Sequence, residues 1–398
     1  MANDTPLQSP VRIVREIPHT VSPGLWALAW KRLKSDNVGM VSLVIVAAFI
    51  AMMIASGTGL VAGDWAKESG VNYAPPSFLG ADIEGGTPAA PGVPAAPTAP
   101  AVEYKSEVVD PLADVLAEIK GEQKPAGTDA AAASAGDAGK SVDPLADVMA
   151  DIRKDARSAP AEIVATRAAT LPFGGDKWGR DVLKKTIKGS ETSIFVGLAA
   201  AAVATLIGTL FGALAGYYGR WVDDFFNWFY SVFSSIPYLL LILAVAAVLQ
   251  QKGTLTIILI LGLTGWTGVF RLIRGEYLKH KAREYVQAAD AIGASNGRRM
   301  FVHIFPNVSH VVLVQLSIYA VGFIKAEVIL SFLGFGVPVD VVSWGSMLNE
   351  AQNELILGKW WQLAAAGTAM AILVTAFSLF TDALRDALDP KLKGLAGA

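Results

Sequence analysis

Cysteine is absent from the 398-residue sequence, and histidine occurs only four times. Without cysteine the chain forms no disulfide and has no thiolate nucleophile or thiolate metal ligand. The histidines are His19, His280, His303 and His310, and none belongs to an H-E-x-x-H zinc site. We therefore predict no catalytic, cofactor-binding or metal-binding residue, and the chain is not expected to be an enzyme.

Charged residues are scarce as well. Only 17% of the residues are charged, 53% are hydrophobic, and the mean hydropathy is +0.44, which is far too apolar for an ordinary soluble protein. The net charge of −2 offers no basic field for a nucleic-acid partner. The phosphate-loop pattern G-x-x-x-x-G-K-[ST] is missing. The composition predicts a protein of the lipid bilayer, and any ATP and Mg²⁺ that drive it must bind to other subunits.

Six apolar runs are each expected to cross the membrane as a helix. They are residues 37–63, 192–219, 225–251, 254–270, 307–324 and 362–381. A signal peptide has an apolar region of about 7–15 residues, whereas the first run, residues 37–63, is long enough to span the bilayer, which takes about 20 residues. Trp26 and Trp30 precede this run, as expected of rings at a headgroup boundary. Pro237 is predicted to kink the third run.

A hydrophilic excursion, residues 64–191, separates the first two runs and contains an internal repeat. The segment 109–120 recurs as 142–153, and in each copy an Asp-Pro pair is suited to start a helix. Two segments of biased composition are predicted to be linkers or disordered: the Pro/Ala-rich residues 85–102 and the Ala/Gly-rich residues 126–139. The two apolar helix faces would pair with each other, lie on the bilayer or bind a partner. Alternatively, the duplication has no essential role.

The distribution of lysine and arginine predicts the orientation. Sixteen of these residues lie on the side of the two termini, and two lie in the short loops of the other side. Because cytoplasmic loops carry the excess of positive charge, both termini are predicted to be cytoplasmic. The predicted divisions are a cytoplasmic segment 1–36, a first span 37–63, an outer excursion 64–191, a core 192–390 with five spans and a cytoplasmic loop 271–307, and a cytoplasmic tail 391–398.

Residues 284–307 form a charged island between two apolar runs. Tyr285, Ala288, Ala289 and Ile292 have the spacing of one helix face. Gly293 is suited to end this helix in a left-handed turn. A second helical run is expected over residues 298–305, after which Pro306 stops or kinks the helix. Two short helices joined at a glycine indicate a docking element.

The island resembles the EAA loop of ABC-importer permeases, whose pattern is E-A-A, three residues, G, nine residues, then I-x-L-P. The spacing of the pattern is intact, but three of its residues differ. Gln287 stands in place of Glu, His303 in place of Ile and Phe305 in place of Leu. The resemblance implies an ATPase-coupling loop with the following residues: Glu284, Gln287, Ala288, Ala289, Asp290, Gly293 and Pro306.

Three further segments resemble the dipeptide/oligopeptide branch of these permeases. Residues 171–183 are similar to P-x-G-T-D-x-x-G-R-D-V-L, with Gly175 in place of Thr. Residues 325–336 are similar to A-E-x-x-L-S-F-L-G-x-G, and residues 381–390 to G-D-x-L-R-D-x-L-D-P. The matching positions are Gly179, Arg180, Asp181, Glu327, Gly334, Asp386 and Asp389. The resemblance covers residues 26–62 weakly and residues 171–392 strongly.

The resemblance implies an all-α membrane protein with the six transmembrane helices of the type I ABC-importer permease fold. It also implies a bacterial inner-membrane location, a second permease subunit, two ATP-binding subunits and a periplasmic substrate-binding protein. The implied cargo is a dipeptide or oligopeptide. Nickel, a glycoside or another small solute is the alternative cargo for the same machine.

Two rival functions follow from other features of the sequence. A self-sufficient secondary transporter would need inverted repeats and paired charges within the membrane, and only Lys325 and Glu327 lie near a span. Each of these two residues is expected to face either the pathway or the outer interface. A membrane scaffold that uses the repeat is the second rival, but it leaves the EAA-like spacing unexplained.

Overall fold

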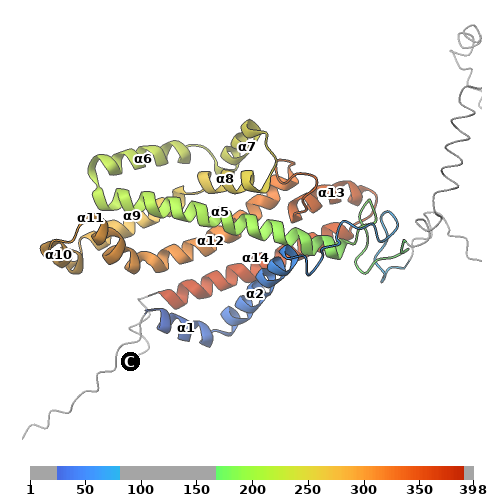
Figure 1. The fold of residues 1–398 in the computed structure, drawn as a ribbon, viewed down its shortest axis with the longest axis horizontal. Helices are drawn as coiled ribbons and strands as arrows, with labels where there is room; N and C mark the ends of the chain where they lie inside the picture. Colours follow the sequence, from blue (N-terminus) through green and yellow to red (C-terminus); the bar gives the residue numbers. More distant parts are fainter. Residues whose placement is uncertain (1–24, 81–166, 390–398) are drawn as a thin grey trace, which may run out of the picture. The chain divides into compact units, whose positions relative to one another are not determined.

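The computed structural model describes residues 25–80 and 167–389 (Figure 1). Regular structure within these residues is entirely helical, and their β pairing is limited to isolated bridges. The predicted all-α class is therefore confirmed. The predicted repeat helices, residues 109–120 and 142–153, lie outside the described residues.

The helices follow one another from α1 to α14. They are α1 (Leu25–Ser35), α2 (Asn37–Gly57), α5 (Val182–Tyr218), α6 (Arg220–Ser234), α7 (Tyr238–Leu249), α8 (Thr254–Thr264), α9 (Thr267–Lys281), α10 (Glu284–Ala291), α11 (Asn296–Arg298), the π-helix η1 (Arg299–Ile304), α12 (Phe305–Phe332), α13 (Trp344–Ile356) and α14 (Trp361–Leu388).

Four helical stretches are individually long and apolar enough to cross a membrane. They are α2, α5, the continuous stretch Asn296–Phe332 that contains α12, and α14. Two bent pairs, α6 with α7 and α8 with α9, supply the other candidates, with bends of 84° and 43°. If each pair is one span, the described chain has the six spans that the sequence predicts.

The sharper bend, between α6 and α7, occurs at Pro237, where the sequence predicts a kink. Helix α6 ends at Ser234, and Pro237 is the residue that precedes the first turn of α7. Proline has a fixed φ and no backbone N–H, so it cannot continue the hydrogen bonding of the preceding helix. The predicted kink in this span is confirmed.

Helix α5 lies along α8, α9 and α12 (Figure 1). Its contact surface is rich in glycine. A Cβ atom on Gly197 would lie 2.3 Å from Ile324 Cγ1, and one on Gly208 would lie 2.6 Å from Val269 Cβ. Because these separations are shorter than a van der Waals contact, only glycine allows the helices to approach this closely. The small residues of the apolar run 192–219 thus permit close packing between these helices.

An aromatic cluster joins α6 to α5 and α9. The ring of Trp266 is buried and contacts Phe211 of α5, Phe229 and Phe233 of α6, and Phe270 of α9, with ring centroids 5.3–5.6 Å apart. Stacked and edge-to-face pairs at this spacing stabilise helix packing beyond the area that they bury. The cluster fixes α6 against the bundle even though a sharp bend separates it from α7.

In the described chain, short helices and loops gather at the two opposite ends of the long helices (Figure 1). Helices α10 and α11, α1 and the C-terminal end of α14 lie at one end, which we call the α10 end. Helix α13 lies at the other end, the α13 end, together with residues 58–80 and 167–181. We call these two loop segments the loop lobe.

Candidate functional site

The residues that resemble the EAA loop form a compact hairpin of helices, and we call residues 284–306 the coupling segment. Helix α10 begins at Glu284, an acidic residue in the first turn, where the helix dipole favours a negative charge. Gly293 follows the end of α10 with φ +80°. The N–H of Gly293 donates to Asp290 O at 2.9 Å, and that of Ala294 donates to Ala289 O at 3.0 Å. These two bonds make a Schellman cap, so the predicted helix end at Gly293 is confirmed.

The predicted alanine face divides into a buried part and an exposed part. Ala289 is 4% exposed and packs inward beside Val286, whereas Ala288 is exposed and Ile292 is 84% exposed. Consecutive helical residues point about 100° apart, and in the described chain only Ala288 of this pair is open to a partner. Ala289 is therefore a residue of the internal core, and the expectation that it belongs to the docking face is wrong. The Gln287 side chain is exposed and donates to Ala282 O at 3.4 Å.

Pro306 does not stop the second helix of the segment. The helix continues from Asn296 to Phe332. Immediately before the proline the helix widens to the π form, in which the N–H of Phe305 donates to Met300 O, five residues earlier. Proline lacks an N–H and its ring clashes with the carbonyl four residues earlier. The wider turn accommodates that ring. Of the two predicted alternatives, a stop or a kink at Pro306, the stop is therefore wrong.

Contacts that the sequence does not reveal hold the coupling segment to α5. Asp290 forms an ion pair with Arg299, which joins the two helices of the segment. Tyr217, near the end of α5, donates its hydroxyl to Asn296 Oδ1 at 3.0 Å, and Lys281 Nζ donates to Tyr217 O at 2.6 Å. In the sequence Tyr217 ends an apolar run and carries no signal for this role.

Gly179, Arg180 and Asp181 lie at the other end of the described chain, in the loop lobe and at the start of α5. Gly179 O accepts from the N–H of Gly70 at 2.8 Å, and a Cβ atom on Gly179 would lie only 2.0 Å from Gly70 O. The Arg180 guanidinium lies over the Trp178 ring, 4.4 Å from its centroid. Asp181 caps α5 by accepting from Leu183 N at 2.8 Å. These three residues therefore shape the loop that leads into α5.

The remaining motif positions do not meet at one site. Glu327 is fully buried and accepts from Ser331 Oγ at 2.7 Å, so the expectation that it faces the pathway or the outer interface is wrong. Lys325 is exposed, as expected for either of its two predicted surroundings. Gly334 has φ +84° and caps α12, while Asp386 and Asp389 lie at the end of α14. Apart from the coupling segment, these positions lie in separate parts of the described chain.

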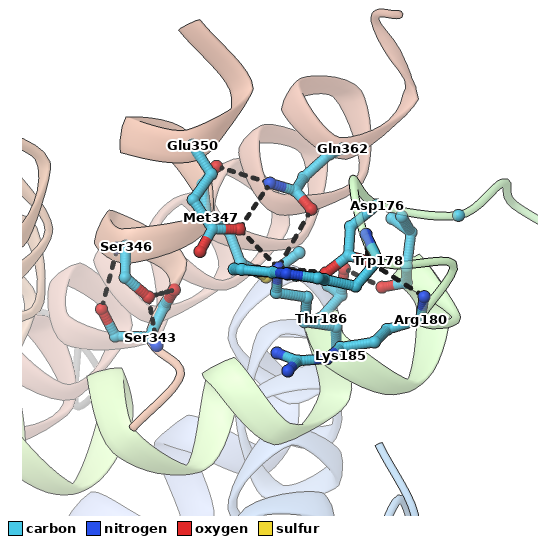
Figure 2. A network of polar contacts seen from close by, with 12 residues as sticks. Asp176, Trp178, Arg180, Lys185, Thr186, Ser343, Ser346, Met347, Glu350 and Gln362 are labelled. Atoms are coloured by element: carbon cyan, nitrogen blue, oxygen red, sulfur yellow. Dashed lines mark hydrogen bonds and ion pairs between the residues drawn. The ribbon is translucent and has the colours of Figure 1, made fainter. Parts of the chain in front are cut away.

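A second polar site, which no pattern in the sequence predicts, surrounds Lys185 at the α13 end (Figure 2). Lys185 is 1% exposed, because α5 begins at Val182 and its first turns are covered. Its Nζ lies 2.8 Å from Asp176 Oδ2 in the loop lobe, 2.6 Å from Glu350 Oε2 on α13 and 3.3 Å from Gln362 Oε1 on α14. We call these four residues the Lys185 network.

The Lys185 network joins four parts of the chain through one buried cation. Gln362 Nε2 also donates to Met347 O at 3.1 Å, which adds a second link between α13 and α14. A buried ion pair is not by itself a source of large stability, but removal of one partner leaves a buried charge uncompensated. The network therefore fixes the position of α13 and of the loop lobe relative to α5.

Glu354 is a further carboxyl group beside this network. It lies one turn along α13 from Glu350 and is 1% exposed. The pKa of Glu354 is raised to about 7, chiefly by burial; the positive charge of Lys185 opposes this rise, and the negative charges of Asp176 and Glu350 add to it. Near neutral pH this carboxyl group is thus divided between its neutral and ionised forms.

Comparison with known proteins places the chain among transport components. Residues 208–394 match the family "binding-protein-dependent transport system inner membrane component", and residues 24–76 match the "N-terminal TM domain of oligopeptide transport permease C". The chain is 38% identical over 221 residues to the dipeptide transport system permease protein DppC of Bacillus subtilis, a match that covers 56% of this chain and 69% of the relative. It is 35% identical over 219 residues to the oligopeptide transport system permease protein OppC of Haemophilus influenzae, covering 55% and 70%.

Replacement of the buried cation tests the Lys185 network. The change Lys185→Met leaves the carboxylates of Asp176 and Glu350 without their positive partner, so we expect a loss of about 3–5 kcal/mol in stability. The matched control is Lys184→Met, because Lys184 pairs with Asp64 at the surface and such pairs contribute about 0–1 kcal/mol. Thermal unfolding of the two variants in detergent gives the comparison. Equal unfolding temperatures would contradict the assigned role.

Glu354 predicts a dependence of stability on pH. Its folded pKa is raised above the ordinary 4.5 to about 7, so its contribution is fully present below the ordinary value and is lost as the pH rises through the folded value. Between about pH 5 and pH 8 the wild-type unfolding temperature is expected to fall, with this group contributing at most roughly 3 kcal/mol. Glu354→Gln should flatten the profile. Identical profiles for the variant and the wild type would refute the assignment.

Proposed function

The chain belongs to the inner-membrane component family of binding-protein-dependent transport systems, in its dipeptide and oligopeptide permease branch, and from that premise we propose that it forms one half of the peptide pathway of an ATP-driven importer. Its helices make it a multi-pass membrane protein. The proposed location is the bacterial inner membrane, with both termini in the cytoplasm. The excess of lysine and arginine on the side of the termini supports this orientation.

The observation that carries the proposal is the exposed apolar surface of the coupling segment. Tyr285 and Ile292 of the first helical part are 38% and 84% exposed, and Phe301 and Val302 of the second are 48% and 58% exposed. Ala288 is exposed between them on α10. Exposed apolar side chains on a well-capped helix are suited to a groove on a partner protein. We infer that this surface binds an ATP-binding subunit.

In the proposed mechanism, movement of the ATP-binding subunits is passed to the membrane helices through contacts on both sides of the coupling segment. The Asp290–Arg299 ion pair keeps its two helices together. The bond that Tyr217 donates to Asn296 then joins the segment to α5, and the bond from Lys281 to Tyr217 O joins the end of α9 to the same residue. A displacement of the segment would therefore displace α5 and the helices packed on it, as in a rigid two-state transition.

The remaining parts of the importer are proposed from family membership. They are a second permease subunit, two ATP-binding subunits that hold ATP and Mg²⁺, and a periplasmic substrate-binding protein. The names of the relatives favour dipeptides or oligopeptides as cargo. A machine of the same design for nickel, a glycoside or another small solute would use the same coupling segment.

A secondary transporter is less consistent with the placement of the charged residues within the spans. Glu327 is fully buried and bonded to Ser331, whereas Lys325 is exposed. The two residues therefore lie on different sides of α12. They do not form the paired intramembrane charges on which the alternative depends.

Gly293 offers a direct test of the coupling role. Its φ of +80° disfavours any side chain, although the space around it is open, because a Cβ atom on Gly293 would meet no other atom within 4 Å. Valine at this position is expected to cost roughly 1–2 kcal/mol in backbone strain and to misplace α10. We predict that the Gly293→Val importer continues to hydrolyse ATP but loses peptide uptake in proteoliposomes.

Gly293→Asn is the matched control, because asparagine accepts the left-handed conformation more readily than valine. It should retain most of the uptake. Both variants should remain folded in detergent, and Gly293→Val should lower the unfolding temperature only by its backbone strain, since the change lies at an exposed turn. Normal uptake by Gly293→Val would argue strongly against the coupling role of this segment.

A further inference from the structure

The first described helix, α1, has one face fixed to the protein. Ala29 and Leu33 are each 6% exposed and belong to a cluster with Ala383 and Leu388 of α14. Arg32 Nη1 donates to Asp389 O at 3.1 Å. These contacts hold α1 along the C-terminal end of α14 (Figure 1). The rotation of α1 about its own axis is thereby fixed, and so is the face that it turns outward.

The outward face combines indole rings with positive charge. Trp26 and Trp30 are one turn apart and each is 52% exposed. Lys31 and Lys34 are also exposed, and α1 contains no acidic residue. At about 100° per residue the two tryptophans lie next to the buried stripe, and the two lysines lie farther round the helix. Apolar rings beside the protein and ammonium groups beyond them match the order of layers at a membrane surface.

The position of α1 along the chain keeps it at that surface. A single residue, Asp36, separates α1 from the membrane-spanning helix α2, and its side chain caps α2 by accepting from Val38 N at 3.0 Å. The first turns of α2 carry valines that are exposed on the outside of the helix. Val38, Val41 and Val44 are 58–63% exposed. Side chains of this kind on a spanning helix face lipid, so α1 starts where the hydrocarbon layer ends.

We propose that the outward face of α1 is a binding site for anionic phospholipid headgroups. The rings of Trp26 and Trp30 lie at the boundary between acyl chains and headgroups, and Lys31 and Lys34 bind the headgroup phosphates. The occupant is lipid because the charge of the face is complementary to anionic headgroups and the face continues the lipid-exposed surface of α2. Each lysine near an anionic leaflet is attracted to it by about 1 kcal/mol.

The lack of cysteine permits a site-specific test on the full-length chain. Ala27, which is exposed on the lysine side of α1, is changed to cysteine and labelled with a fluorophore. The labelled protein is reconstituted in vesicles that contain either phosphatidylglycerol or phosphatidylcholine with a spin label near the headgroup. At equal mole fraction we expect phosphatidylglycerol to quench at least roughly fivefold more effectively, the factor that one lysine contributes.

The double variant Lys31→Gln/Lys34→Gln should lose this preference. Lys252→Gln, at an exposed lysine of the turn between α7 and α8, should keep it. Equal quenching by the two lipids, or a preference that survives the double variant, would overturn the proposal. Quenching by aqueous iodide without quenching by either lipid would also overturn it, since the outward face of α1 would then face water. The result does not depend on the transported solute or on ATP-binding subunits.

Discussion

The close contact between α5 and its neighbours is the constraint on which the rest of the structure depends. Glycines let α5 approach the backbones of α9 and α12 within distances that exclude a Cβ atom. The helix has 37 residues, about 55 Å at 1.5 Å per residue. It carries Lys185 near one end and Tyr217 near the other. One densely packed helix thus connects the network that holds α13 with the coupling segment that is proposed to meet the ATP-binding subunits.

The two ends of α5 differ in the chemistry that fixes them. At the α13 end a buried cation gathers carboxylates from separate elements, so the loss of one partner there is costly. At the α10 end the contacts are single hydrogen bonds from the buried Tyr217 and from the exposed Lys281. A single hydrogen bond breaks at a lower free-energy cost than the one that follows when a buried ion pair loses a partner. This difference suits a helix that is anchored at one end and receives movement at the other.

Features that depend on local sequence could be predicted, and features that depend on distant residues could not. The bend at Pro237 and the helix end at Gly293 follow from the backbone properties of single residues. The division between Ala288 and Ala289 depends on what packs beneath α10, which the helical period does not specify. Lys185 meets Glu350 and Gln362 across 165 and 177 residues of sequence, and its neighbouring lysines give it no distinguishing pattern. The family resemblance located the coupling segment but not Tyr217, because that residue lies outside the motif.

The central claim, that the coupling segment and the end of α5 move as one body, is tested most directly by distance measurement between spin labels. Arg298 and Tyr218, both exposed, make the first labelled pair, and Arg298 with the exposed Asp386 makes the second. Distances are compared in the assembled importer with and without trapped ATP. We predict an unchanged distance from Arg298 to Tyr218 and a changed distance from Arg298 to Asp386. A change between Arg298 and Tyr218 as large as that of the second pair would contradict the claim.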